Sequence, residues 1–246
     1  MSRFVVHATW EDCPHLSDEV KQDLLASIPP YQHDARSKGI PQLGSGAIYP
    51  LSEADIVISD FPIPAHYPRV YGMDVGWNRT AAIWGAKDLE TGVVYLYSEH
   101  YRGQAEPVIH AESIKSRGKW IPGVIDPASR GRGQKDGVQL LQVYRDHDLD
   151  VQPANSAREA GIFKVWTMLS SGKLKVFKSC GHWIDEFRIY RRDENGKVVK
   201  AQDHLMDATR YLVMSGIDRI QTEPVGRSEA KTHYIDPSQP ATGWMM

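Results

Sequence analysis

This 246-residue sequence contains only two cysteines and lacks long apolar runs. No stretch of about 18 apolar residues occurs, so we expect no membrane-spanning helix. Acidic side chains lie where the apolar core of a signal peptide would be, which predicts that the chain carries none. The two cysteines, Cys13 and Cys180, are far apart and match no metal-ligand spacing. These features exclude a disulfide-rich scaffold and a structural zinc site, and they favour a reducing compartment.

Two further absences narrow the possible functions. The sequence has no G-x-x-x-x-G-K-[ST] loop, which argues against an ordinary nucleoside triphosphatase. The net charge is only −2, which argues against a strongly basic nucleic-acid coat. The charge is uneven, because residues 158–200 contain ten basic and five acidic residues, a net +5, against −7 elsewhere. Such a block permits polyanion binding at one face, although charge alone favours a solvated surface.

Helix breakers divide the chain into three parts. Residues 17–28 predict one helix, with Ser17 as the N-cap and a Pro-Pro pair as the stop. Dense Pro and Gly then predict an extended linker, so that the first part, 1–67, is a helix followed by a linker. We expect a folded domain over 68–220 and a flexible polar tail over 221–246.

The pattern within the folded domain predicts a mixed sheet. Strands are expected over 69–77, 80–87, 93–101, 120–126, 151–154 and 174–177, and helices over 106–117, 137–147, 157–169, 180–189 and 203–215. A turn at Glu-Asn-Gly predicts a β-hairpin over 190–199. Three antiparallel strands followed by alternating strands and helices indicate an α/β fold with helices on both faces of the sheet.

Asp74 lies in the middle of the first predicted strand, in YGMDVGW. A carboxylate in an apolar strand is costly to bury unless it is paired or binds a metal ion. Gly72 and Gly76 share its face, and we expect them to leave room beside it for a ligand because they lack side chains. The alternative is an Asp that caps a turn at the end of a strand.

Asp126 ends the strand WIPGVID and precedes a loop rich in Gly and basic residues. Ligands of α/β proteins bind at the carboxyl ends of strands, so Asp126 is a second candidate. The alternative is an ordinary Asp-Pro turn. The basic residues of the loop, Arg130, Arg132 and Lys135, are expected either to reach phosphates or to be solvated.

Asp203 and Asp207 share one face of the last helix because they are four residues apart. Two acids at this spacing repel each other unless a cation lies near them. Asp207 borders the apolar stripe, which directs its carboxylate toward the sheet, whereas Asp203 is alternatively a first-turn cap. His204 is a candidate proton-handling neighbour, or simply an exposed residue of the first turn.

Three carboxylates, from the first strand, the fourth strand and a late helix, can meet at one end of a mixed sheet. Ligand sets made only of oxygen suit Mg²⁺ or Mn²⁺. Two such ions about 4 Å apart can hold the attacking and leaving oxygens of a phosphodiester. The sequence therefore predicts a candidate metal site that includes Asp74, Asp126 and Asp207.

The segments YGMDVGW, VIDPASRG and DHLMDATRYLVMSG resemble the nuclease domain of the large terminases of tailed bacteriophages, over about 68–216. Residues 5–50 resemble the stretch that leads out of the terminase ATPase domain. The resemblance implies a ribonuclease-H-like fold in which Asp74, Asp126 and Asp207 bind Mg²⁺ or Mn²⁺, with two ions expected. It implies an auxiliary role for Asp203.

The family often has an auxiliary β-hairpin before the last helix, and residues 188–200 match its position. The resemblance implies contact between DNA phosphates and the basic residues of this segment, which are Arg188, Arg191, Arg192, Lys197 and Lys200.

The function that the resemblance implies is metal-dependent cleavage of concatemeric viral double-stranded DNA during genome packaging, in the cytoplasm of an infected bacterium. The expected partners are DNA, the terminase small subunit and the portal protein, with no membrane. Because the ATPase motifs are missing, we expect a nuclease fragment or a split gene product that does not translocate DNA. One alternative is a Holliday-junction resolvase or integrase of the same fold. The other is a non-catalytic module that docks on the portal or a regulator.

Overall fold

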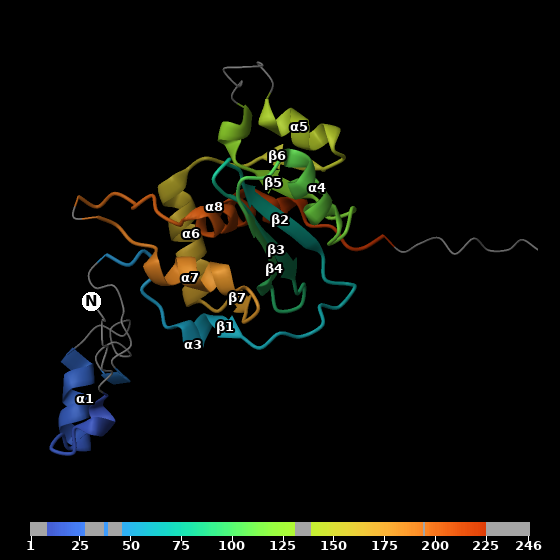
Figure 1. The fold of residues 1–246 in the computed structure, drawn as a ribbon. Coiled ribbons are helices and arrows are strands. Elements are labelled where there is room, and N and C mark those ends of the chain that lie inside the picture. The colour runs from blue at the N-terminus through green and yellow to red at the C-terminus, as the bar shows by residue number, and fades with distance from the viewer. Residues whose placement is uncertain (1–8, 28–36, 39–45, 131–138, 194, 225–246) are drawn as a thin grey trace, which may run out of the picture.

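The computed structural model describes residues 9–27, 37–38, 46–130, 139–193 and 195–224. Seven of its strands form one mixed sheet, in the order β1-β7-β4-β3-β2-β5-β6 (Figure 1). Within these ranges no helix is long and apolar enough to cross a membrane.

The strands have the following bounds: β1 Val57–Ile58, β2 Arg69–Asp74, β3 Thr80–Lys87, β4 Val94–Arg102, β5 Gly123–Ile125, β6 Val151–Pro153 and β7 Leu174–Phe177. The α-helices are α1 Asp18–Ser27, α3 Glu53–Ile56, α4 Pro107–Lys115, α5 Leu140–Asp146, α6 Arg158–Ser170, α7 Gly181–Ile189 and α8 His204–Tyr211. The final predicted helix continues past α8 as a π-helical turn, Leu212–Gly216.

Strands β2, β3 and β4 form the antiparallel meander that the sequence predicts. Strands β5 and β6 extend the sheet beside β2 in parallel, and β7 pairs in parallel with β4. The sheet is therefore mixed, and the carboxyl ends of β2 and β5 lie at the same edge.

Successive residues of a strand face opposite sides of the sheet, and β3 shows this alternation clearly. Ala81 and Ile83 belong to the apolar cluster that contains residues of α6, α7 and α8. Ala82 and Trp84 belong to the cluster that contains residues of α4 and α5. Figure 1 shows these two groups of helices on opposite sides of the sheet. The predicted α/β fold with helices on both faces is confirmed.

The segment before residue 68 differs from the extended linker that the sequence suggested. Ile48, Tyr49 and Ile56 are buried in the core, and β1 pairs in parallel with β7 at the edge of the sheet. A two-residue strand is too short to show periodicity, so its pattern could not separate it from a linker. The placement of a domain boundary at residue 68 stays a prediction.

Residues 46–48 are hydrogen-bonded to the chain that follows α7. The backbone oxygen of Gly46 accepts from the amide of Arg192 at 2.7 Å, and the amide of Ile48 donates to the oxygen of Tyr190 at 3.0 Å. Ala47 and Arg191 form an antiparallel bridge between these two bonds.

The predicted β-hairpin is present in a minimal form. A single antiparallel bridge joins Arg192 to Val198, and the carboxylate of Asp193 accepts from the amides of Asn195 and Lys197, both at 2.9 Å. Gly196 takes the positive φ of 75° that the turn requires. Because α7 includes Arg188, the hairpin begins only after that residue.

A buried histidine pair joins β4 to α4. His100 Nε2 lies 2.9 Å from His110 Nδ1, and Ser113 Oγ lies 3.0 Å from His100 Nδ1. Burial lowers the pKa of His100 to about 4, and the charges of His110, Arg117 and Arg102 lower it too. Burial also lowers the pKa of His110. Burial therefore favours the neutral form of both imidazoles in the folded protein.

We expect the free energy of unfolding to fall as the pH drops from about 6.5 toward 4. The histidines of the unfolded chain are protonated in this range, whereas burial opposes protonation of the same histidines in the folded protein. The loss due to His100 should reach about 2 kcal/mol at pH 5, measured by urea unfolding. The variant His100→Asn should start less stable at pH 7 but lose less on acidification. An equal loss in parent and variant would contradict the assignment.

Candidate active site

Asp74 and Asp126 leave the sheet side by side. Asp74 is the last residue of β2, and Asp126 directly follows β5. The two strands are parallel neighbours with Met73 opposite Ile125, and the amide of Asp126 donates to the oxygen of Met73 at 2.9 Å. The expected meeting of these two carboxylates at one edge of the sheet follows from this register.

Asp207 reaches the same place from α8, which packs against β2, and it is buried as its place beside the apolar stripe predicts. Burial raises the pKa of Asp74, and the negative charges of Asp207 and Asp126 raise it further, whereas a hydrogen bond with His204 opposes the rise. The structure thus brings the three predicted aspartates into one electrostatically coupled site.

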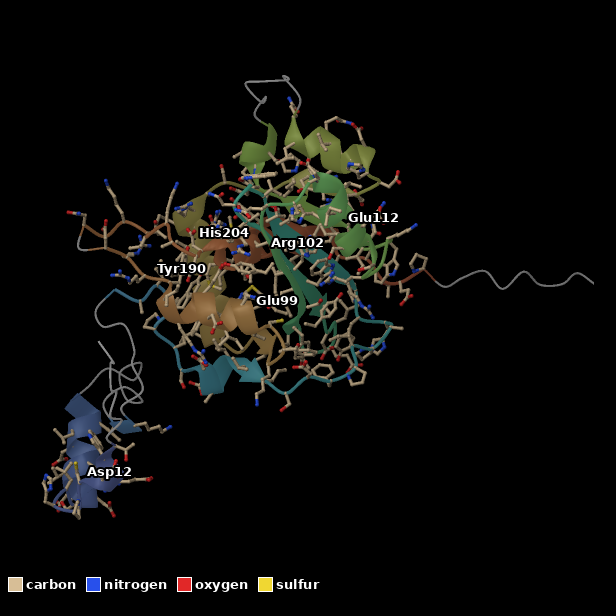
Figure 2. All side chains as sticks on the ribbon, viewed as in Figure 1. Asp12, Glu99, Arg102, Glu112, Tyr190 and His204 are labelled. Carbon is tan, nitrogen blue, oxygen red and sulfur yellow. The ribbon has the colours of Figure 1, made fainter. Side chains whose placement is uncertain are left out.

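The two predicted auxiliary residues lie beside these aspartates. His204, labelled in Figure 2 at the start of α8, places Nδ1 2.9 Å from Asp74 Oδ2, and this hydrogen bond raises the pKa of the imidazole. Asp203 occupies the N-cap position of α8. Burial raises the pKa of Asp203, and the charge of Asp207 adds to the rise.

Two arginines offset the charge of Asp207. Arg210 donates from Nε and Nη2 to Asp207 Oδ1 at 3.1 and 3.0 Å, and Arg158 Nη2 lies 3.3 Å from Oδ2. The guanidinium of Arg210 also lies over the ring of Tyr211, whose hydroxyl donates to Asp126 Oδ1 at 3.0 Å. Together with His204, these contacts mean that side chains of α8 reach all three aspartates.

Glu186 fixes the start of α8. This buried carboxylate on α7 accepts hydrogen bonds from the amides of Leu205 at 2.6 Å and Met206 at 3.2 Å. These amides belong to the first turn of α8, where backbone N–H groups have no acceptor within the helix. Burial raises the pKa of Glu186 to about 7.

Gly72 does not leave room for a ligand, contrary to the expectation from sequence. A Cβ atom at this position would lie 2.1 Å from the backbone oxygen of Ala208 and 2.9 Å from the amide of Leu212. The backbone of α8 and of the turn that follows it fills the space instead. At Gly76 a Cβ would lie 3.1 Å from the oxygen of Arg79, within the turn after β2. The missing side chain at Gly72 brings the helix that carries Asp207 against the strand that carries Asp74.

Two of the predicted DNA-binding residues are engaged within the protein. Arg188 pairs with Glu53 at 2.6 and 2.9 Å, and Arg192 pairs with Glu159 at 2.5 and 3.1 Å. The other basic residues of the hairpin make no ion pair within the part of the chain that the structure describes; they are Arg191, Lys197 and Lys200.

The other predicted basic cluster follows Asp126. Arg132 and Lys135 lie outside the described residues, as does the side chain of Arg130, whose backbone ends the 3-10 turn Pro127–Arg130. Their expected contact with phosphates stays a prediction.

Four residues that support the site were not predicted from the sequence: Arg158, Glu186, Arg210 and Tyr211. A signal existed for Arg210, which lies three residues after Asp207 and so shares its helix face. Glu186 is an acid between the apolar residues Trp183 and Phe187, which indicates a buried carboxylate in need of a partner. Nothing local points to Arg158, 49 residues before its partner.

The donor chemistry of the three aspartates suits a hard divalent cation, because all their ligand atoms are oxygens. As the described side chains stand, however, no three Asp, Glu, His or Cys residues are grouped closely enough to hold a metal ion. Each aspartate faces a protein partner instead: His204 for Asp74, Tyr211 for Asp126 and two arginines for Asp207. Metal binding would require some of these contacts to change.

Residues 71–215 match the family described as Terminase RNaseH-like domain. The large terminase subunits of Salmonella phage P22 and Enterobacteria phage LP7 are each 34% identical over 223 residues, which is 87% of this chain. The match covers 44% of the P22 protein and 46% of the LP7 protein. The chain thus spans less than half the length of these relatives.

Solved structures show the same fold. The P22 large terminase nuclease domain superposes with a TM-score of 0.65 at 32% identity, covering 73% of this chain and 96% of that chain. The large terminase nuclease of thermophilic phage G20c with bound cobalt has a TM-score of 0.51 at 14% identity, covering 70% and 98%. The bacteriophage SPP1 g2p nuclease domain with bound Mn has a TM-score of 0.50 at 17% identity, covering 66% and 95%.

We expect Gly72→Ala to destabilise the fold by about 3 kcal/mol, because the added methyl group forces the α8 backbone away from β2. Urea unfolding measures this change. The matched control is Gly181→Ala, since a Cβ there has no atom within 4 Å, and its stability should stay near that of the parent. Equal stabilities for the two variants would contradict the close approach.

Proposed function

Because this chain belongs to the terminase RNase H-like domain family, we propose that it is a metal-dependent endonuclease that cuts viral double-stranded DNA during genome packaging. The observation that carries the proposal is the convergence of Asp74, Asp126 and Asp207 at one edge of the sheet. The nuclease domains of SPP1 and G20c share this fold and were solved with bound Mn and cobalt, respectively, which supports the proposal that this chain binds a divalent cation.

In this proposal Asp74, Asp126 and Asp207 hold two Mg²⁺ or Mn²⁺ ions. Bound ions of this kind activate a water molecule and stabilise the charge of the leaving oxygen. The protein supplies orientation: Tyr211 holds Asp126 by its hydroxyl, and the buried Arg210 holds one oxygen of Asp207.

His204 and Asp203 act as auxiliary groups in this proposal. The imidazole of His204 donates from Nδ1 to Asp74 and so keeps one carboxylate oxygen of Asp74 fixed. Asp203, whose raised pKa reflects burial and the charge of Asp207, adds a further acid at the same end of α8.

The hairpin is the proposed DNA contact. Arg191, Lys197 and Lys200 carry charges that no acidic residue within the described ranges neutralises, so they remain available for phosphate. The charges of Arg188 and Arg192 are shared with Glu53 and Glu159, and we assign these two residues a smaller part. Phosphate contacts position DNA without reading sequence, so little base preference is expected.

The proposed setting is an infected bacterial cell, with the terminase small subunit and the portal protein as partners of the longer protein. Since this chain spans less than half of its relatives, DNA translocation is not assigned to it. A Holliday-junction resolvase or integrase would instead prefer branched DNA, and a docking module would not cut.

We expect nicking and linearisation of supercoiled plasmid in Mg²⁺ or Mn²⁺, and EDTA should abolish both. Asp74→Asn, Asp126→Asn and Asp207→Asn should each lower the rate by more than the roughly tenfold to hundredfold typical of losing an outer partner of a metal ligand. The control is Asp146→Asn on α5, an exposed acid whose carboxylate accepts a hydrogen bond from Gln142 at 2.8 Å. A folded parent that fails to cut, or an Asp74 variant as fast as the parent, would overturn the proposal.

DNA binding should depend on Lys197 and Lys200 of the hairpin, which form no ion pair with the residues that the structure describes. The double variant Lys197→Gln/Lys200→Gln should reduce the slope of log affinity against log salt concentration by about 2, since each phosphate contact contributes about 0.9. Fluorescence anisotropy with duplex DNA and EDTA measures this slope. Arg188→Gln is the comparison and should change it by less than about 1, because Glu53 already neutralises Arg188. The reverse order would exclude the lysines as the contact.

A further inference from the structure

The two arginines that contact Asp207 differ in their freedom to leave it. Arg210 is 2% exposed and donates two hydrogen bonds. It lies so close to α6 that a Cβ at Gly161 would be 2.5 Å from Arg210 Cγ. Arg158 makes one contact of 3.3 Å, and a third of its side chain is exposed. Burial therefore fixes the side chain of Arg210, whereas the side chain of Arg158 has room to change its rotamer.

Arg158 also lines an open groove between the start of α6 and the hairpin. Arg192, Lys197 and Lys200 lie along the same groove, as do the acids Glu159 and Asp193, which are engaged by Arg192 and by turn amides. The guanidinium of Arg158 thus lies between the carboxylate of Asp207 and a groove whose lysines make no ion pair with any described residue. Rotation of its side chain would move the guanidinium from the carboxylate of Asp207 to an anion bound in the groove.

The contacts of Asp207 leave no carboxylate oxygen unshared. Arg210 occupies Oδ1 and Arg158 occupies Oδ2. Oδ1 accepts two hydrogen bonds, whereas Oδ2 accepts one and keeps a lone pair for a cation. A divalent cation at Oδ2 would lie beside the guanidinium of Arg158, and of the two arginines Arg158 is the one that is partly exposed and singly bonded. Like charges repel, so a bound metal ion would itself favour the departure of Arg158.

We infer that Arg158 is a displaceable counter-cation of Asp207, which gives up the carboxylate to a divalent metal ion and turns to a DNA phosphate in the groove. This inference rests on the proposed function, because it assigns the metal and the DNA to the same site. Arg158 is a positioning residue in this scheme: it links occupation of the site by metal to engagement of the substrate.

The test is a Mn²⁺ titration of the 246-residue chain, followed by the electron paramagnetic resonance signal of free Mn²⁺, with no DNA present. Arg158→Gln should bind Mn²⁺ about fivefold more tightly than the parent, because it removes a competing ion pair of ordinary strength. Arg158→Lys retains the charge and should bind near the parent value. The control is Arg192→Gln, which lines the same groove but pairs with Glu159, and its Mn²⁺ affinity should match the parent.

Plasmid cleavage at saturating Mn²⁺ is the second measurement. Arg158→Gln should cut about tenfold more slowly than the parent despite its tighter metal binding, and Arg158→Lys should recover most of the rate. A residue with a merely structural role would weaken metal binding and cleavage together. Thermal unfolding confirms that each variant is folded.

The outcomes separate this inference from the proposed function. Equal Mn²⁺ affinities for the parent and Arg158→Gln would overturn the counter-cation role and leave the metal site standing. Tighter Mn²⁺ binding with undiminished cleavage would overturn the turn toward DNA. Failure of both proteins to bind Mn²⁺ would overturn the metal site, and the inference with it.

Discussion

The site depends on the contact between the backbone of α8 and the face of β2 at Gly72. The oxygen of Ala208 lies where a Cβ of residue 72 would be, so no side chain separates the helix from the strand. The same helix carries Asp207, and the same strand ends at Asp74. Any residue with a side chain at position 72 would push these two carboxylates apart. The separation between acids from distant parts of the chain is thus fixed by a glycine that takes no part in the chemistry.

The second constraint is electrostatic, since acids brought together in a partly buried place repel each other unless cations accompany them. The protein supplies partners itself: a hydrogen bond from His204 for Asp74, and the cations Arg210 and Arg158 for Asp207. Arg210 is buried against α6, so its ion pair with Asp207 is not expected to break when the site binds a ligand. Each of the three aspartates therefore already has a partner within the protein, and among the described residues no preformed set of metal ligands is present.

The sequence predicts the local features well. The small and apolar residues of β3 and the short, mostly apolar segment of β7 predict strands with the observed bounds, because each strand is largely buried and bounded by turn residues. The positions of Asp74, Asp126 and Asp207 relative to their elements suffice to predict that these residues meet. These predictions depend on periodicity and on the geometry of parallel strands, which neighbouring residues determine.

What the sequence could not provide are the partners that distant segments bring. Arg188 reads as a free cation until Glu53, 135 residues earlier, is seen beside it. The same holds for Arg158 and Asp207. The interpretation of Gly72 as space for a ligand was wrong, because a missing side chain predicts close approach without saying whether ligand or backbone approaches.

The hydrogen bonds between residues 46–48 and the chain after α7 have a mechanical consequence. The bonds of Gly46 with Arg192 and of Ile48 with Tyr190 flank one antiparallel bridge, and such bonds run across the direction of the chain. Tension applied to residues 46–48 along the direction of the chain would load both bonds in shear together instead of breaking them one by one. The first structure to receive that force is the base of the hairpin, before the sheet. A displacement of residues 46–48 would therefore move the base of the hairpin, which forms one wall of the groove beside α6.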